Sequence, residues 1–236
     1  NFSSILYIIK MIESVLFFGR KNCPYSYKLK RYLKNKTKKL FYVESKKIKE
    51  KIKLGNYLKR TYSYIICFRS HYILKKNLIN KAKNAAINFH PGTPKYRGIG
   101  CINYALYEDT KFYGSTCHLI NETIDSGKIL SLKKFKVLKK DTIESALQKT
   151  YKIMLIQAKE VIRLLDEDKK NLNIMINKNK KIKWSKKIKT LKELNKFYEI
   201  RTNSSKSEIK RKIRATYTKL FKPYTITKGK KIIYYK

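Results

Sequence analysis

Two short polar segments of this 236-residue chain carry side chains suited to chemistry. Asn88 and His90 stand two residues apart at the end of an apolar run, so in an extended strand they face the same way. Asp125 lies in a second polar segment, residues 121–127. An amide, an imidazole and a carboxylate in one cleft can meet a developing oxyanion and move a proton. Each has a structural alternative when taken alone, as a satisfied strand-end histidine or a turn-capping aspartate.

The elements around these segments predict an α/β fold. The expected strands cover residues 14–19, 39–44, 62–68, 85–89, 114–120 and 129–137. The expected helices cover residues 25–33, 46–54, 75–82, 101–107 and 142–165. Early alternation of strand and helix is typical of a doubly wound, mostly parallel, Rossmann-like sheet, which binds ligands beyond the carboxyl ends of its strands. Asp141, with Glu144 three residues later, predicts the cap of the last helix.

Composition divides the chain into three parts. Residues 1–13 form an N-terminal extension, of which the first ten precede Met11 and are a candidate upstream segment. We expect a catalytic domain over 14–168 and a small C-terminal α+β subdomain over 169–236, where the sequence turns rich in Lys and Asn. Within that subdomain, Ser205-x-x-Glu208 is a capping box that predicts a helix, and a hairpin is expected over 224–235.

The charge balance is strongly basic, with a net charge of +42. Lysine carries it, since 49 of the 58 basic residues are Lys and nine are Arg. Two explanations stand: drift toward adenine- and thymine-rich codons, or selection for a polyanionic partner such as nucleic acid. Residues 83–131 hold five basic and four acidic residues, so the excess charge lies outside the segment with the candidate site.

Other function classes find little support in the sequence. No apolar run approaches the roughly 20 residues of a membrane span, and residues 5–9 are too short for an export signal, so a cytoplasmic location is expected. The four cysteines are expected to be buried, reduced thiols. Gly98-x-Gly100 does not indicate a dinucleotide site, because Asn103 stands where the third glycine should be. There is no P-loop and no His-Glu-x-x-His zinc motif.

Four ordered motifs within residues 60–140 resemble the N10-formyltetrahydrofolate-dependent formyltransferase superfamily. The motifs are Asn88-x-His90-Pro91-Gly92, Pro94-x-Tyr96-Arg97-Gly98, Gly114-x-Thr116-x-His118 and Ile124-Asp125-Ser126-Gly127. That superfamily contains glycinamide ribonucleotide, methionyl-tRNA and nucleotide-sugar N-formyltransferases. Four motifs in the same order are far more specific than any one of them.

The resemblance implies a catalytic trio of Asn88, His90 and Asp125, with N10-formyltetrahydrofolate as co-substrate and no metal. His118 and Thr116 face the same side of the expected strand 114–120, so we expect them to support the site from behind, with a merely structural role as the alternative for His118. The residues implied to hold the pterin are Ile66, Cys67, Phe68, Thr123 and Ile124, with segment 69–73 along the cofactor tail. Plain core packing is the alternative for Ile66 and Phe68. Arg97 is expected either to meet an anionic part of the acceptor or to stabilise its loop.

The expected activity is formyl transfer to a primary amine of a small acceptor, such as a nucleotide-linked amino sugar. The Pro-Gly-Thr-Pro loop over 91–94 and the short, partly helical C-terminal part depart from the methionyl-tRNA enzymes. The basic surface nevertheless keeps a tRNA acceptor as the second hypothesis, and glycinamide ribonucleotide is the third. From a different class, a catalytically idle nucleic-acid-binding protein on the same fold is the rival. The oligomeric state stays open.

Overall fold

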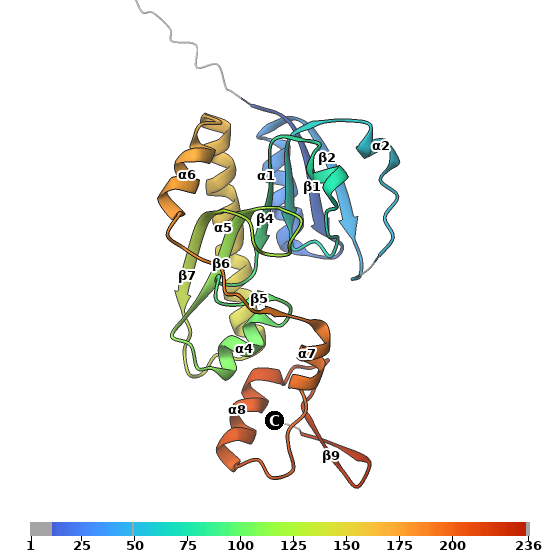
Figure 1. Ribbon diagram of the computed structural model, residues 1–236, viewed down its shortest axis with the longest axis vertical. Helices are drawn as coiled ribbons and strands as arrows, with labels where there is room; N and C mark the ends of the chain where they lie inside the picture. The colour runs from blue at the N-terminus through green and yellow to red at the C-terminus, as the bar shows by residue number, and fades with distance from the viewer. Residues whose placement is uncertain (1–10, 49, 235–236) are drawn as a thin grey trace, which may run out of the picture.

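A six-stranded sheet forms the centre of the computed structural model, which describes residues 11–48 and 50–234 (Figure 1). Its strands are β1 (Ile12–Arg20), β2 (Thr37–Ser45), β3 (Tyr62–Phe68), β4 (Ala82–His90), β6 (Phe112–Leu119) and β7 (Ile129–Lys136). Their order is β2-β1-β3-β4-β6-β7. The first four strands of this order run parallel, whereas β6 is antiparallel to both of its neighbours. The predicted mostly parallel sheet is therefore confirmed.

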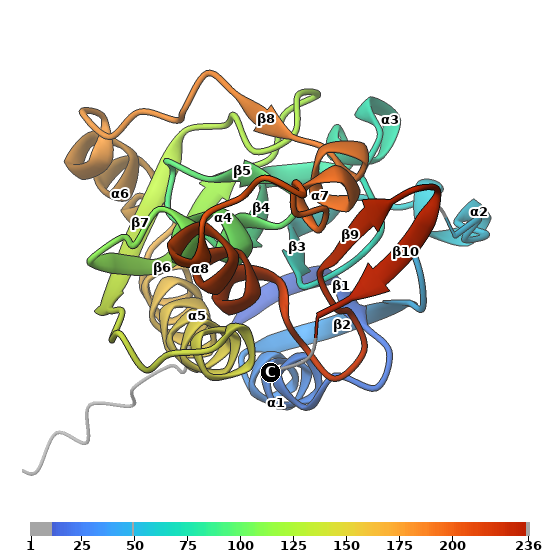
Figure 2. The ribbon, with the colours of Figure 1, turned by 90° about the horizontal axis from the view of Figure 1, so that it is seen from below.

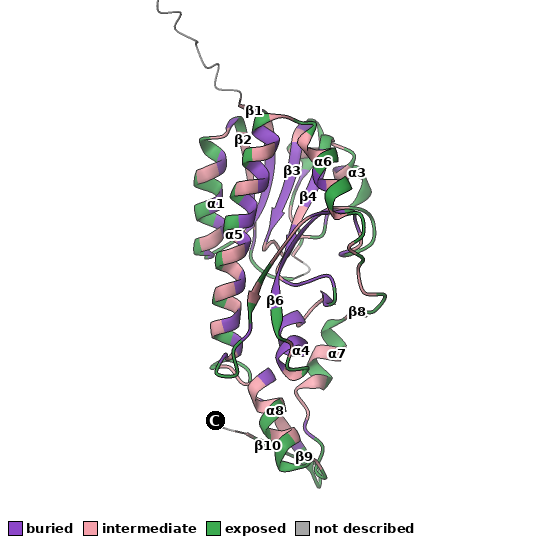
Figure 3. Ribbon diagram, turned by 90° about the vertical axis from the view of Figure 1, so that its left-hand side faces the viewer, coloured by how far each residue is buried: buried purple, intermediate pink, exposed green. Residues whose placement is uncertain are grey.

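Helices cover both faces of the sheet, as Figures 2 and 3 show. On one face, α1 (Pro24–Lys34) and α5 (Ile143–Glu167) lie side by side and bury Leu29 and Met154 against the strands. On the other face, α3 (Lys76–Ile79) and the turn α2 (Gly55–Leu58) pack over β1 and β3. Alternate residues of β3 serve the two cores, with Ile66 on the first face and Cys67 on the second. This double burial explains why the strands read as continuous apolar runs.

The C-terminal part folds beneath the loop that follows β4. A two-stranded sheet joins β5 (Arg97–Gly98) to β8 (Ile188–Lys189), and α4 (Cys101–Tyr107) packs against α8 (Lys206–Thr216). The Asn103 side chain donates to the Ala215 carbonyl at 2.7 Å and fastens these two helices. The remaining elements are α7 (Leu191–Phe197) and the hairpin β9 (Tyr224–Thr227) and β10 (Lys230–Ile233). A small α+β appendage is thus present, as predicted.

The segment just beyond residue 168 continues the main core. There α6 (Asn171–Asn179) places Met175, which is 7% exposed, in the same apolar cluster as α5. The division of the chain at residue 168 stays a prediction. The candidate upstream segment, residues 1–10, lies outside the described residues, as does Tyr235 at the end of the expected hairpin.

Two local predictions are wrong. The described part of 46–54 contains no helix, because lysines four apart repel one another and the Glu50 carboxylate accepts from the Lys46 backbone N–H instead. Asp141 does not cap α5. Thr142 does so in a reciprocal capping box with Ser145, while the Asp141 carboxylate pairs with Lys149 at 2.7 Å.

The cysteines are free and buried, as predicted: Cys23, Cys67, Cys101 and Cys117. Across 11–48 and 50–234, no helix combines the length and apolar character needed to cross a bilayer. Within the same ranges, no cluster of three or more His, Cys, Asp or Glu side chains is arranged to hold a metal ion.

A buried amide fixes β6 against α5 and offers a test of the fold. Gln157 is fully buried, and its amide donates to the Ser115 carbonyl at 3.2 Å and to Ser131 Oγ at 3.0 Å. Gln157→Met keeps the length but leaves buried polar partners unsatisfied, so we expect the free energy of unfolding to fall by about 1–3 kcal/mol in urea titrations. Gln148→Met, on the exposed side of α5, is the matched control. Equal stability of the two variants would contradict this account.

Candidate active site

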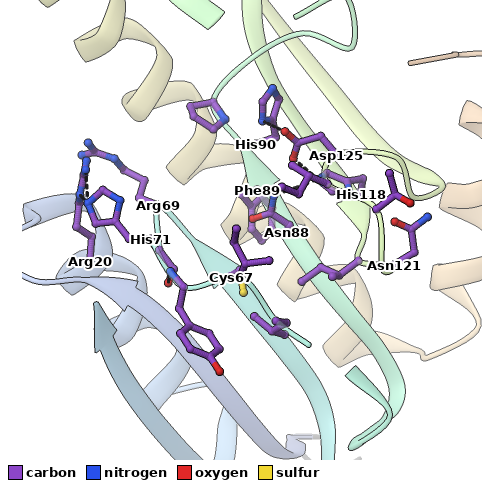
Figure 4. A pocket seen from close by; sticks show the side chains of 18 of the residues that line it. Arg20, Cys67, Arg69, His71, Asn88, Phe89, His90, His118, Asn121 and Asp125 are labelled. Atoms are coloured by element: carbon purple, nitrogen blue, oxygen red, sulfur yellow. Dashed lines mark hydrogen bonds and ion pairs between the residues drawn. The ribbon is translucent and has the colours of Figure 1, made fainter. Parts of the chain in front are cut away.

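The end of β4 brings two of the candidate residues to the edge of a cavity. Antiparallel pairing of β4 with β6 sets Asn88 opposite His118 and His90 opposite Thr116. The cavity has a volume of about 300 Å³. Asn88, His90, His118 and Asp125 are among its lining residues, and Figure 4 shows them together on one side of it. Four predicted residues from three segments are therefore neighbours.

Asp125 is held in place by its own backbone and by the loop after β4. Its φ of 47° lies in the left-handed region, which a non-glycine residue adopts at a cost. The Gly98 backbone N–H donates to Asp125 Oδ2 at 3.0 Å. These two constraints turn the carboxylate inward, where it is 8% exposed.

The buried carboxylate lies between two histidines. Asp125 Oδ2 is 3.3 Å from His90 Nδ1, and Asp125 Oδ1 is 3.5 Å from His118 Nε2. His118 Nε2 is also 3.1 Å from the Asn88 amide nitrogen, while its Nδ1 is 2.7 Å from the Leu119 carbonyl oxygen. The sequence placed His118 behind the site, but the structure puts it in contact with both Asn88 and Asp125. One connected polar network therefore spans the trio.

Burial and mutual attraction shift the pKa values of this network. Burial, the largest single influence, lowers the pKa of His90, but the Asp125 carboxylate, Cys101 and the Tyr96 carbonyl together outweigh it and raise that pKa to about 9. For Asp125, burial raises the pKa, yet His90 and His118 hold it well below its usual range. His90 Nε2 is also 2.8 Å from the Tyr96 carbonyl oxygen. Both ring nitrogens thus face acceptors, which favours the imidazolium form at neutral pH.

Close packing at Gly92 supports the position of the His90 ring. A Cβ atom at this position would lie 2.6 Å from His90 Nε2, so a larger residue would displace the imidazole. Thr116 holds the same turn from below, because its hydroxyl donates to the Gly92 carbonyl at 2.7 Å. Thr116 is fully buried and supports the loop that carries His90.

Arg97 joins two loops through backbone carbonyls. Its guanidinium donates to the Ser185 carbonyl and to the Ile124 carbonyl, both at 2.8 Å. The side chain is 7% exposed and does not line the cavity. Two roles were expected for Arg97, and these contacts fit the stabilisation of its loop. A contact of Arg97 with the acceptor stays a prediction.

The residues expected near the pterin divide into two groups. Cys67, Thr123 and Ile124 line the cavity. The side chains of Ile66 and Phe68 lie in the main core instead, 1% and 0% exposed, because they alternate to the other face of β3 from Cys67. Any contact of these two residues with a ligand is left to their backbone, and the pterin site itself stays a prediction.

Trp184 belongs to the site although sequence reasoning missed it. The edge-to-face contacts of its ring are with His90, at 5.7 Å between ring centroids, and with His118, at 5.0 Å. Its Nε1–H donates to the Gly127 carbonyl at 2.8 Å. The strap that carries it, residues 184–189, runs along the loop after β4: the Ser185 N–H donates to the Pro94 carbonyl, and the Ile99 N–H donates to the Lys189 carbonyl. The indole thus contacts both histidines without lining the cavity itself.

Some residues at the opposite end of the cavity were also not predicted from the sequence. Arg20, Arg69 and Tyr151 line it together with His71. Segment 69–73, expected along the cofactor tail, lines the cavity, and Arg20 on β1 and Tyr151 on α5 join it only through the fold. Two features of the sequence could have pointed to these residues. Trp184 is the single Trp of the chain, and Arg is scarce beside Lys.

The sequence matches known proteins over its first two thirds. Residues 18–162 match the model of the formyl transferase family. A methionyl-tRNA formyltransferase from Thermodesulfovibrio yellowstonii is 30% identical over 128 residues, which make up 52% of this chain and 41% of that protein. The trifunctional purine biosynthetic protein adenosine-3 of Chironomus tentans is 31% identical over 111 residues, 46% of this chain and 8% of that protein. The chain thus matches less than half of the length of either relative.

Solved structures share the fold over nearly the whole chain. A sugar N-formyltransferase from Shewanella has a TM-score of 0.70 at 17% identity and covers 94% of this chain and 96% of its own. An N-formyltransferase from Helicobacter canadensis, in complex with folinic acid and dTDP-3-aminofucose, has a TM-score of 0.64 at 19% identity, over 94% and 86% of the two chains. At such identities the likeness establishes the fold.

The His90–Asp125 pair predicts a lower pKa of His90 when the carboxylate is removed. In Asp125→Asn the attraction is lost and burial still lowers the pKa of His90, so that pKa should fall clearly from about 9, as followed by NMR of the imidazole protons. The stability due to His90 in the wild type is complete below about pH 6.5 and is lost as the pH rises through about 9, so wild-type unfolding should become easier over that window while Asp125→Asn should not. Asp109→Asn, at an exposed acid, should titrate like the wild type. An unchanged His90 titration in Asp125→Asn would refute the pairing.

Trp184 yields a separate prediction. Trp184→Ala admits water beside His90, which weakens the attraction from Asp125, so the pKa of His90 should move from about 9 toward 6.5. Trp184→Phe keeps an aromatic ring over the histidines and loses only the hydrogen bond to Gly127, so it should titrate close to the wild type. NMR titration of the three proteins checks this. Identical titration in Trp184→Ala and the wild type would show that the indole does not shield the pair.

Proposed function

Because the chain belongs to the formyl transferase family, we propose that it moves a formyl group from N10-formyltetrahydrofolate to a primary amine. The proposed acceptor is a nucleotide-linked amino sugar or another small molecule. One observation carries the proposal: Asn88, His90 and Asp125 converge at one end of a cavity of about 300 Å³. The catalytic roles of these residues are part of the proposal.

The network suits attack of an amine on a formyl carbon. The oxygen of the tetrahedral centre becomes negative and needs preorganised donors. One N–H of the Asn88 amide faces His118 Nε2, which leaves the second N–H for that oxygen. The positive charge of His90, stabilised by Asp125, adds electrostatic stabilisation beside it.

The same network can carry a proton away from the attacking amine. His118 Nε2 accepts from Asn88 while it is unprotonated and faces Asp125 Oδ1 at 3.5 Å when it takes up a proton. Asp125 is held as a carboxylate, since its pKa lies below the usual range. The ionised acid therefore stabilises a proton that His118 takes up from the amine, and the two imidazoles can pass a proton on toward the leaving nitrogen.

The choice of a small acceptor is supported by the size of the site. The cavity accommodates small-molecule groups. The Helicobacter canadensis protein of the same fold was crystallised with folinic acid and dTDP-3-aminofucose, a nucleotide-linked amino sugar. The tRNA hypothesis is favoured by the name of the Thermodesulfovibrio relative and by the basic surface. An idle nucleic-acid-binding protein is disfavoured, because the trio is complete and connected.

The proposal is tested by release of tetrahydrofolate. The purified protein is incubated with N10-formyltetrahydrofolate and amino-sugar nucleotides, glycinamide ribonucleotide or charged initiator tRNA. Asn88→Ala, His90→Gln and Asp125→Asn should each lower turnover by about 10²–10⁴-fold while the fold stays intact by circular dichroism. Asp109→Asn is the charge-matched control. Near-wild-type turnover in His90→Gln and Asp125→Asn would remove the site assignment, and inactivity with every acceptor would remove the proposed function.

A further inference from the structure

A second cavity lies in the C-terminal part of the molecule. Its lining residues come from α4, β8, α7, α8 and the segment after α7, and Figures 1 and 2 show the three helices next to one another. This C-terminal cavity has a volume of about 330 Å³ and shares no lining residue with the cavity of the catalytic network. All of its lining residues except Tyr104 lie beyond residue 162, where the family match ends. The proposed formyl transfer therefore gives it no role.

The hydroxyl of Tyr104 is buried at this cavity without a hydrogen-bond partner. Tyr104 is 6% exposed, and across 11–48 and 50–234 no group forms a hydrogen bond with its hydroxyl. Burial raises the pKa of that hydroxyl to about 12, so the group keeps its proton at neutral pH. Folded proteins rarely leave a buried polar group unsatisfied, and a bound ligand or water is the usual explanation where they do. The hydroxyl is therefore a donor that lacks an acceptor.

Four cationic side chains line the same cavity: Lys189, Lys196, Arg201 and Lys212. No carboxylate of the described chain forms an ion pair with any of them. Lys212 Nζ lies 3.9 Å from the centroid of the Phe197 ring and donates to the Phe197 carbonyl at 2.9 Å, while Lys189 Nζ lies 4.3 Å from the centroid of the Tyr104 ring. Burial lowers the pKa of both ammonium groups. These charges have lost part of their hydration and have gained no counter-charge.

Two carboxylates in the lining do not cancel the positive charge. Glu193 is used in the cap of α7, where its Oε2 accepts from the Thr190 N–H at 2.8 Å and from the Thr190 hydroxyl at 3.0 Å. Glu199 forms no ion pair among the described residues. Four cations against two carboxylates leave two positive charges in the cavity. A ligand that balances them carries at least two negative charges.

We propose that the C-terminal cavity is a second ligand site, which binds a small molecule through a phosphate or diphosphate group. Ammonium and guanidinium groups donate to phosphate oxygens, and the Tyr104 hydroxyl supplies a further donor. The volume suits a small molecule. The site adjoins the loop after β4, because the Lys189 carbonyl accepts from the Ile99 N–H at 2.9 Å. The backbone of RNA offers the same phosphate chemistry, so the experiment includes RNA as a separate probe.

The test follows the ring protons of Phe197 by NMR while sodium pyrophosphate is added at physiological salt. A local signal is needed because Arg69 and Arg20, whose Nε donates to His71 Nε2 at 2.7 Å, line the catalytic cavity and also attract anions. In the wild type the Phe197 signals should shift and then saturate. The Kd obtained from them belongs to the C-terminal cavity alone.

Charge variants should move this Kd in opposite directions. Arg201 is exposed, so Arg201→Gln removes one cation of the lining without disturbing the core, and the Kd should rise roughly 10-fold. Glu199→Gln removes a like charge and should lower the Kd about 3- to 10-fold. Lys192→Gln on α7 and Glu13→Gln on β1 change exposed residues outside the cavity and should leave the Kd unchanged.

Tyr104→Phe tests the unsatisfied hydroxyl by two measurements. Without pyrophosphate, the urea midpoint of unfolding should be no lower than that of the wild type, because the variant removes a buried group that has no partner. The Kd for pyrophosphate should nevertheless rise roughly 10-fold. Tyr113→Phe is the matched control: its hydroxyl is buried but donates to the Pro91 carbonyl at 2.7 Å, so its removal should lower the midpoint and leave the Kd unchanged.

An unchanged Kd in Arg201→Gln and Tyr104→Phe would show that pyrophosphate binds elsewhere on the basic surface, and would overturn the proposal. If a short single-stranded RNA shifts the Phe197 signals at lower concentration than pyrophosphate does, the cavity is an RNA contact and the small-molecule assignment is wrong. Circular dichroism confirms that each variant is folded. Binding is measured without turnover, so a protein that binds pyrophosphate here and transfers no formyl group would contradict the proposed function alone.

Discussion

A buried aspartate between two histidines is the constraint on which the site depends. A carboxylate that is 8% exposed is stable only when opposite charges or hydrogen-bond donors surround it. Here His90, His118 and the Gly98 N–H supply them, and they come from β4, β6 and β5. The need to satisfy one charge therefore ties together the end of the sheet, the loop after β4 and the turn after β6. The same carboxylate raises the proton affinity of His90. The group that holds the segments together therefore also sets the protonation of the imidazole.

The C-terminal part takes part in that constraint. The strap around Trp184 is hydrogen-bonded along the loop after β4, and Arg97 connects the strap to the turn that carries Asp125. Trp184 makes edge-to-face contacts with both histidines. A region that the sequence marks only by its Lys- and Asn-rich composition is thus needed to complete the site. The change in composition near residue 168 therefore does not mark the end of the site, because Trp184 lies beyond it.

Charge is organised inside the cavity although it is diffuse on the surface. The Asp125 end is a closed network of one anion and its histidines, whereas the Arg20 and Arg69 end carries two cations with no acidic partner among the described residues. The two ends of the cavity therefore differ in the charges that line them. The many surface lysines add a sequence-independent attraction for polyanions, screened by salt, that does not distinguish one acceptor from another.

The sequence by itself determined most of the elements, because these follow from local rules, and its ordered motifs singled out the candidate site residues. Short continuous apolar runs placed β1, β3 and β4, the spacing of Asn88 and His90 put both on one side of β4, and the ordered motifs singled out Asp125. Where local rules compete, as between Asp141 and Thr142 at the start of α5, the prediction was wrong. Only the tertiary structure decided which distant groups meet: His118 with Asn88 through antiparallel pairing, Trp184 with both histidines, and Arg20 with His71. Such contacts depend on how strands order themselves in the sheet and how loops close over long sequence separations, and no local period records those.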